Sequence, residues 1–114
     1  MQLLNRQLGN IMQTDKTIHN NDEVTINIKG TLSGPESIRK LTAELDDLFS
    51  RNIRIINLNM TETDSIESAA ITQILVYKKR FSEKNTLLRI NGCSERLIKI
   101  LKMLKLDNSI SIIE

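Results

Sequence analysis

The sequence is poor in the residue types from which most catalytic centres are built. Its 114 residues hold one cysteine, one histidine and four scattered glycines. The single cysteine, Cys93, excludes an intramolecular disulfide and fits a reducing compartment. One thiol and one imidazole are too few ligands for an ordinary zinc site, and no glycine-rich phosphate loop occurs. We therefore expect a protein that is not an enzyme and that holds no metal or cofactor.

Aromatic residues and long apolar runs are also scarce, and positive and negative charges are nearly balanced. Aromatics make up 3% of the chain, and 16 basic against 14 acidic residues leave a net charge of +2. Balanced charge and few rings argue against nucleic-acid binding. No apolar run approaches the roughly 18 residues of a membrane span, and no secretory leader is recognisable. These absences predict a cytoplasmic domain without a membrane span.

Residues 1–20 form the least regular part of the sequence, and we separate them as an N-terminal arm from a domain at 21–114. Thr17 to Asn20 predict a short edge strand before a turn at Asn20–Asp22. Two interpretations of the arm remain open: loose packing on the domain, or docking of a partner, including a second copy in a weak dimer. Five apolar residues have the spacing of one face of a short helix: Leu3, Leu4, Leu8, Ile11 and Met12.

The rest of the chain alternates between strand and helix patterns. Glu23–Lys29 alternates apolar and polar residues and predicts a half-buried strand that Gly30 ends. Ser33–Glu36 resembles a capping box with proline in the first turn, so a helix should follow and stop near Ser50. The aliphatic run Ile53–Leu58 predicts a central strand covered on both faces, followed by a polar loop.

Two further helices and two further strands complete the pattern. The first helix carries Ile71, Ile74, Leu75 and Phe81 and ends at Asn85; a strand follows at Thr86–Ile90. Ser94 can cap the last helix, whose inner face is Leu97, Ile98, Leu101 and Leu104, and Ile110–Ile113 is the last strand. Helices between strands imply right-handed crossovers. We predict an α/β domain: a mainly parallel four- to five-stranded sheet with helices after strands 2, 3 and 4.

Basic residues recur along the last predicted helix, at Arg96, Lys99, Lys102 and Lys105. Steps of three drift around a helix, so these residues do not make one narrow stripe. Two interpretations stay open. They form a solvated face, or they dock on an acidic partner or an anionic lipid.

The junction Glu67–Ser68 stands where a polar segment turns into a helix. The first backbone amides of a helix have no intrahelical partner, so a serine hydroxyl there can act as an N-cap. The same free amides and the helix dipole also tolerate a phosphate. Phosphorylation of Ser68 would add nearly two negative charges beside Glu67, Glu62 and Asp64. The residues alone leave both roles open.

Four stretches of the sequence carry a family resemblance. They are INIKGTLSG at 26–34, the strand Ile55–Met60 with Asn59 near its end, the segment Ile66-Glu67-Ser68-Ala69-Ala70-Ile71, and the closing run LLRINGCSERLIKILKMLKLDNSISII. Together they make the run from Val24 to Ile113 similar to a STAS domain, the fold of bacterial anti-sigma-factor antagonists. The resemblance covers about 90 of the 114 residues, and the segment around Ser68 is its most specific part.

The resemblance implies a regulatory role for Ser68. In such antagonists the serine after the aspartate is phosphorylated by a partner that is both a serine kinase and an anti-sigma factor. The unphosphorylated domain binds this kinase and frees the sigma factor, phosphate blocks the binding, and a phosphatase resets the switch. The expected partner-binding surface joins Ser68 to Glu67, Asn59, Thr61, Glu62, Asp64, Ser33 and Gly34, since the carboxyl ends of parallel strands gather functional loops.

Three positions depart from the family pattern. Glu67 replaces the usual aspartate and is one methylene longer. Ala70 replaces a glycine that allows special backbone dihedrals, which predicts a more regular helix start. Ser65 stands where a large apolar residue is common. An alternative function is therefore a STAS scaffold, or a transporter accessory protein, that binds partners without a phosphate switch.

Overall fold

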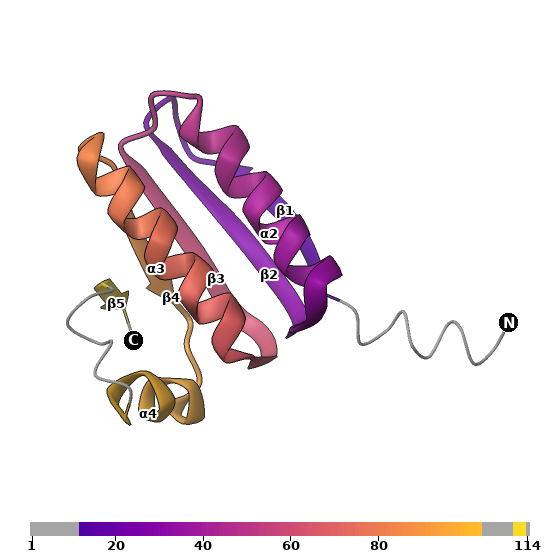
Figure 1. Cartoon of the computed structure of the whole chain (residues 1–114). Helices are drawn as coiled ribbons and strands as arrows, with labels where there is room; N and C mark the ends of the chain where they lie inside the picture. The colour runs from indigo at the N-terminus through magenta and orange to yellow at the C-terminus, as the bar shows by residue number, and fades with distance from the viewer. Residues whose placement is uncertain (1–11, 104–110, 114) are drawn as a thin grey trace, which may run out of the picture.

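The computed structural model describes residues 12–103 and 111–113. The elements follow the order β1 (Gln13–Ile18), β2 (Glu23–Leu32), α2 (Gly34–Phe49), β3 (Ile55–Ile66), α3 (Ser68–Glu83), β4 (Leu87–Asn91), α4 (Glu95–Met103) and β5 (Ser111–Ile113) (Figure 1). This is the predicted alternation of strands and helices. Leu104 and Lys105, together with the first four apolar residues of the predicted N-terminal helix, lie outside the described residues.

The strands form one sheet in the order β1-β2-β3-β4-β5. β1 runs antiparallel to β2, whereas β2, β3, β4 and β5 are parallel to their neighbours. Each parallel connection passes through a helix, as parallel neighbours require. The predicted fold class is confirmed: a mainly parallel sheet with helices after β2, β3 and β4.

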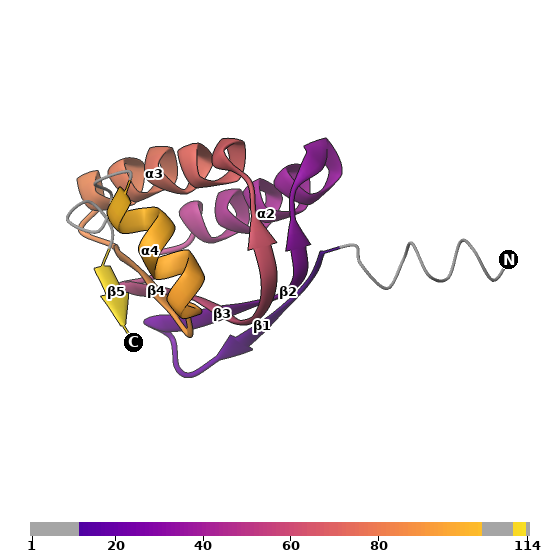
Figure 2. The ribbon, with the colours of Figure 1, turned by 90° about the horizontal axis from the view of Figure 1, so that it is seen from below.

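Helices α2 and α3 lie side by side over one face of the sheet (Figure 2). Between them and the sheet lies an almost wholly aliphatic core, whose fully buried side chains include Ile26, Ile28, Leu32, Leu41, Leu45, Ile56, Leu58, Met60, Ile74 and Leu88. The other face is polar. Asn57 accepts a hydrogen bond there from Arg89 Nε at 2.9 Å. Asn57 is buried, so the central part of β3 is covered on both faces as predicted, but polar side chains and not a helix cover this second face.

The edge strand β1 lies earlier in the chain than predicted. It pairs with β2 from Gln13 opposite Lys29 to Ile18 opposite Val24, so these residues of the arm belong to the sheet. Met12, just before it, is fully buried. The following turn is held by Asn20, whose Oδ1 accepts hydrogen bonds from the Asp22 and Glu23 amides at 2.7 and 3.1 Å. That side-chain bond makes residues 19–22 a turn rather than the end of a strand.

Strands β2 and β3 both run further than predicted. β2 passes through Gly30 to Leu32, and β3 continues to Ile66, so residues 61–66 are strand rather than a polar loop. The extra segments pair with each other, from Lys29 opposite Glu62 to Leu32 opposite Ile66, with two register shifts. Because this pairing joins residues more than thirty positions apart, the local sequence carries no sign of it.

The predicted helix boundaries are largely correct. Asn85 has a positive φ of 62° and follows Lys84, the C-cap of α3. Ser94 Oγ accepts a hydrogen bond from the Leu97 amide at 3.1 Å at the start of α4. The capping box at α2 does not form its bonds. Ser33 is the N-cap but makes no side-chain cap bond, and Glu36 instead pairs with Arg39 at 2.6 Å.

Candidate functional site

Ser68 is the first residue of α3, directly after the carboxyl end of β3, and it is exposed. The N-cap is Glu67, whose backbone oxygen accepts hydrogen bonds from the Ala70 and Ile71 amides at 3.0 and 3.2 Å. Ser68 therefore lies one position inside the helix and does not cap it. Its hydroxyl group is exposed at the positive end of the α3 dipole.

Glu67 joins α3 to the neighbouring helix. Its Oε1 accepts a hydrogen bond from the Gly34 amide, the first residue of α2, at 3.1 Å. Its own amide donates to the Leu32 carbonyl at 3.1 Å. The side chain makes no bond to the amides of α3. Glu67 therefore forms a bridge between the N-termini of two helices.

Ala70 occupies the position at which a glycine is expected from the family pattern. It is fully buried, and Asn85 is the one non-glycine residue with a positive φ in the part of the chain that the structure describes. Ala70 thus has ordinary helical geometry, and the predicted regular helix start is present. A methyl group packs where a glycine would leave space.

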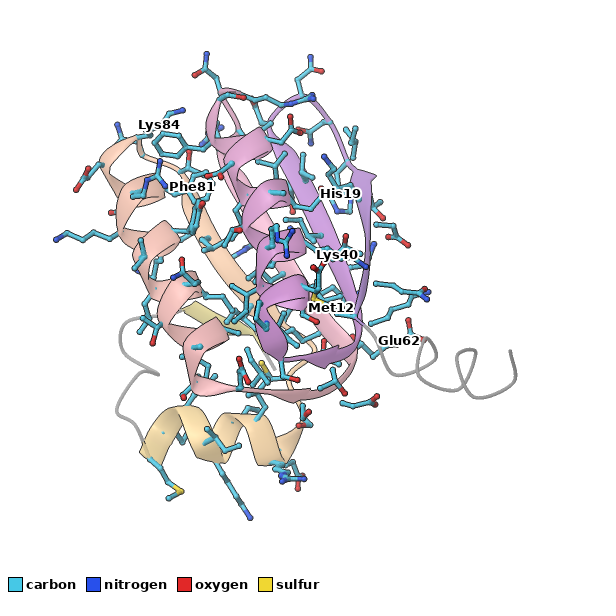
Figure 3. The ribbon with its side chains drawn as sticks, turned by 45° about the vertical axis from the view of Figure 1, so that its right-hand side comes forward. Met12, His19, Lys40, Glu62, Phe81 and Lys84 are labelled. Carbon is cyan, nitrogen blue, oxygen red and sulfur yellow. The ribbon has the colours of Figure 1, made fainter. Side chains whose placement is uncertain are left out.

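Two acidic residues of the predicted surface lie along the last part of β3. Glu62, labelled in Figure 3, is exposed and pairs with Lys29 of β2 at 3.5 Å. Asp64 is also exposed, and with Ser65 and Ile66 it lines a small cavity of about 70 Å³. Ser33, Gly34, Glu67 and Ser68 gather at the helix starts, and the two acidic residues approach them along β3.

The structure does not bring Asn59 and Thr61 to this group. Asn59 Nδ2 donates to Asn27 Oδ1 at 2.9 Å, and its Oδ1 accepts from Thr61 Oγ1 at 2.6 Å. Both residues line the polar face of the sheet beside Gly92. Since a strand rises about 3.3 Å per residue, Asn59 lies roughly 25 Å from Glu67 along β3. The unpredicted extension of β3 causes this separation.

Helix α4 adds residues to this edge that we did not predict from the sequence. Arg96, Leu97 and Ile100 line the same small cavity as the end of β3. Figure 1 shows α4 at the end of the sheet where α3 begins. A signal for this placement was available, because every helix of a parallel sheet starts at the carboxyl ends of the strands.

The residues considered for catalysis or metal binding have other environments. Burial raises the pKa of the Cys93 thiol to about 11, opposite to the activation that a helix start can give. His19 Nε2 lies 2.7 Å from Thr25 Oγ1 on the polar face. Within residues 12–103 and 111–113, no cluster of three His, Cys, Asp or Glu residues could hold a metal ion. Nor is any helix there both long and apolar enough to cross a membrane.

Solved structures with the same fold are similar to this chain at low sequence identity. The unphosphorylated anti-sigma factor antagonist SpoIIAA matches with a TM-score of 0.75 and 13% identity, over 90% of this chain and 89% of its own. An anti-sigma factor antagonist from Mycobacterium paratuberculosis gives 0.78 and 7%, over 90% and 86%. A sulfate transporter family protein from Wolinella succinogenes gives 0.67 and 17%, over 84% and 76%.

No curated protein matches the sequence. The profile of the STAS domain family matches residues 12–114. This range contains each strand and helix that the structure describes, β1 included. The chain belongs to the STAS domain family.

Proposed function

We propose that this protein is a non-enzymatic, cytoplasmic regulator that binds a protein partner and is switched by phosphorylation of Ser68. The partner is a serine kinase that also acts as an anti-sigma factor, and a phosphatase removes the phosphate. The observation that carries the proposal is the position of Ser68: an exposed hydroxyl at the first residue of α3, on the edge where the starts of α2 and α3 meet.

The local geometry suits a switch that acts on binding and leaves the fold intact. A phosphoserine carries about −1.5 to −2 charges, and the N-terminus of a helix stabilises such charge. Because the Ser68 hydroxyl caps no helix, its modification removes no bond from the fold. Glu67 and Asp64 already make this surface acidic, and a phosphate on Ser68 adds further negative charge to it. A partner surface that fits the unmodified domain is then repelled or poorly matched, so binding weakens.

Two structural neighbours support the proposal. SpoIIAA has been solved both in its unphosphorylated form and in its phosphorylated form. The phosphorylated structure matches this chain with a TM-score of 0.70 over 90% of its length. The same fold therefore accommodates a phosphorylated state in that protein.

The test uses labelling and affinity together. The full chain is incubated with labelled ATP and an extract of its own cells, and the protein that labels it is purified. Ser68→Ala should abolish the label, and Ser68→Asp should weaken binding of the labelling kinase at least tenfold. Ser82→Ala and Ser82→Asp are matched controls at the other, exposed end of α3. A label that persists in Ser68→Ala, for instance on Ser65, overturns the assignment.

A second function is a STAS scaffold or transporter accessory protein without a phosphate switch. The bond from the Gly34 amide to Glu67 favours it, because the acidic group before the serine is already engaged in the fold. The similarity in fold to the sulfate transporter family protein agrees with this role. Under this function Ser68→Asp leaves partner affinity unchanged, which separates the two proposals in a single measurement.

A further inference from the structure

The exposed face of α4 carries basic side chains and one apolar side chain. Arg96, Lys99 and Lys102 are exposed, and Met103 is 81% exposed. The opposite face is committed to the domain, since Leu97 and Leu101 are 7% and 2% exposed. α4 is therefore a docked helix whose outer side is free for a partner.

The basic residues share this outer side because the helix is short. At 3.6 residues per turn, positions 96, 99, 102 and 103 fall within an arc of about 120°. Steps of three drift too little over the nine residues of Glu95–Met103 to separate them. The sequence pattern alone did not predict this, because it extended the drift to Lys105, which lies outside the described residues.

These three basic residues also differ from the basic residues of the domain that form ion pairs. Ion pairs engage six basic residues: Lys16, Lys29, Arg39, Arg51, Arg80 and Arg89. Among the residues that the structure describes, no ion pair involves Arg96, Lys99 or Lys102. Glu95 is the one acidic side chain on α4. At 3.6 residues per turn Glu95 falls within the same arc, so the outer face of α4 carries three positive charges and one negative charge, a net charge of +2.

The basic face is continuous with the edge that holds Ser68. The cavity of about 70 Å³ lies between α4 and the end of β3 and is lined by Ser65 and Ile66 on one side and Arg96 and Ile100 on the other. Figures 1 and 2 both place α4 at this end of the sheet. A partner that covers Ser68 can therefore cross this shallow junction onto α4.

We propose that the outer face of α4, formed by Arg96, Lys99, Lys102 and Met103, docks an acidic surface of the protein partner that binds at Ser68. This inference rests on the proposed function and adds the chemistry of the partner. Cations beside one exposed methionine match an interface in which apolar contact is surrounded by complementary charge.

The same face fits a membrane poorly. Interfacial helices bury an apolar face in the lipid, but Leu97 and Leu101 of α4 are already buried in the domain. Charge alone strengthens binding to an anionic membrane about fivefold per basic residue. Three such residues then give about a hundredfold, which is too little to hold a protein on a membrane without a second anchor.

The test is an NMR titration of the ¹⁵N-labelled full chain with an oligoglutamate peptide at low salt, in which the chemical shifts of the backbone amides are measured. Shifts should centre on 96–103 and extend to 63–66. The double variant Arg96→Glu/Lys99→Glu should lower the affinity for the peptide at least tenfold. Lys40→Glu/Lys79→Glu is the control, since it changes the net charge equally at exposed positions of α2 and α3. Equal weakening by both variants, or shifts spread over the whole surface, overturns the proposal.

Two further arms separate the alternatives. The first measures binding of the wild type to phosphatidylserine vesicles. If the vesicles bind more tightly than the peptide and their binding depends equally on Arg96 and Lys99, the proposal of a protein partner is overturned in favour of a membrane. Ser68→Ala should leave the peptide titration unchanged. Phosphorylation of Ser68 and binding of the acidic peptide at α4 are therefore independent observations. Either one can be absent while the other is present, so the two proposals fail separately.

Discussion

The carboxylate of Glu67 accepts a hydrogen bond from the amide of Gly34 at 3.1 Å, which joins the start of α3 to the start of α2. Both helices begin at the carboxyl ends of parallel strands, where free amides face outward. The bond fixes the relative position of the two segments that border Ser68. The shape of the candidate surface therefore depends on one exposed glutamate.

Removing the Glu67 side chain tests this bridge. Glu67→Ala loses a charge-assisted hydrogen bond to a backbone amide and should lower the free energy of unfolding by about 1 kcal/mol. Glu67→Gln keeps an acceptor and should lose less. The control is Glu62→Ala, which removes an exposed ion pair with Lys29 worth about 0.5 kcal/mol or less. Urea denaturation measures all three, and equal losses for Glu67→Ala and Glu62→Ala would contradict the bridge.

A negative charge at Ser68 should not destabilise the fold. Ser68→Asp places the charge in the first turn of α3 and should raise the free energy of unfolding by about 0.3 kcal/mol. Ser82→Asp places the same charge in the last turn, where the dipole has the opposite sign, and should lower it by a similar amount. Thermal unfolding of the two variants shows the order. If Ser68→Asp is the less stable one, its loss of partner binding reports partial unfolding and not a switch.

Two glycines with positive φ provide a matched pair of substitutions. Gly92 has a φ of 73°, and a Cβ there would lie 2.3 Å from Thr61 Oγ1 and 2.8 Å from the Thr61 backbone nitrogen. Gly34 has a φ of 83° but open space around the same position. Gly92→Ala should cost roughly 3 kcal/mol, from backbone strain plus steric overlap, and Gly34→Ala about 1 kcal/mol, from strain alone. Denaturation at equilibrium compares them, and the reverse order would be incompatible with the packing of β4 against β3.

Tyr77 predicts a dependence of stability on alkaline pH. Burial, and then the hydrogen bond and charge of Asp46, raise the pKa of Tyr77 above its ordinary value of 10.0. The unfolded chain therefore loses this proton at lower pH than the folded one, so the stabilisation is complete below pH 10 and is lost as the pH rises through the raised pKa. Tyr77 is the one tyrosine of the chain, and absorbance therefore reports its titration directly.

The same titration separates the two causes. Asp46→Asn removes the negative charge and should move the midpoint part of the way back toward 10, because burial is the larger cause. Arg80 pairs with Asp46 at 3.8 Å and loses this ion pair in the variant. Its positive charge lies over the Tyr77 ring and lowers the pKa of Tyr77, which adds to the same direction of change. A midpoint at or below 10 in the wild type would show that Tyr77 is not buried as the structure has it.

The alternation of apolar residues was enough to predict the fold class and most of the core. Val24, Ile26 and Ile28 alternate as half-buried strand residues do, and Leu41, Leu45 and Leu48 recur at helical spacing; all six are buried. Ser94 and Asn85 mark helix ends by local chemistry, and both predictions are confirmed. These features are encoded within a few residues of each other.

The details of the candidate site depend on contacts between distant segments. Thr61 to Ser65 carry no apolar pattern, so nothing local predicts that they extend β3 by pairing with 29–32. That extension carries Asn59 and Thr61 away from Ser68 onto the polar face. The bridge from Gly34 to Glu67 spans thirty-three positions, and a sequence motif cannot show which amide a longer carboxylate reaches.

The most direct test of the central claim is the intact mass of the protein recovered from its own cells, followed by peptide mapping across 61–75. The proposed switch predicts a fraction of molecules with one phosphate, located on Ser68 and absent in Ser68→Ala. A chain that carries no phosphate under any growth condition, or carries it on another residue, would contradict the switch.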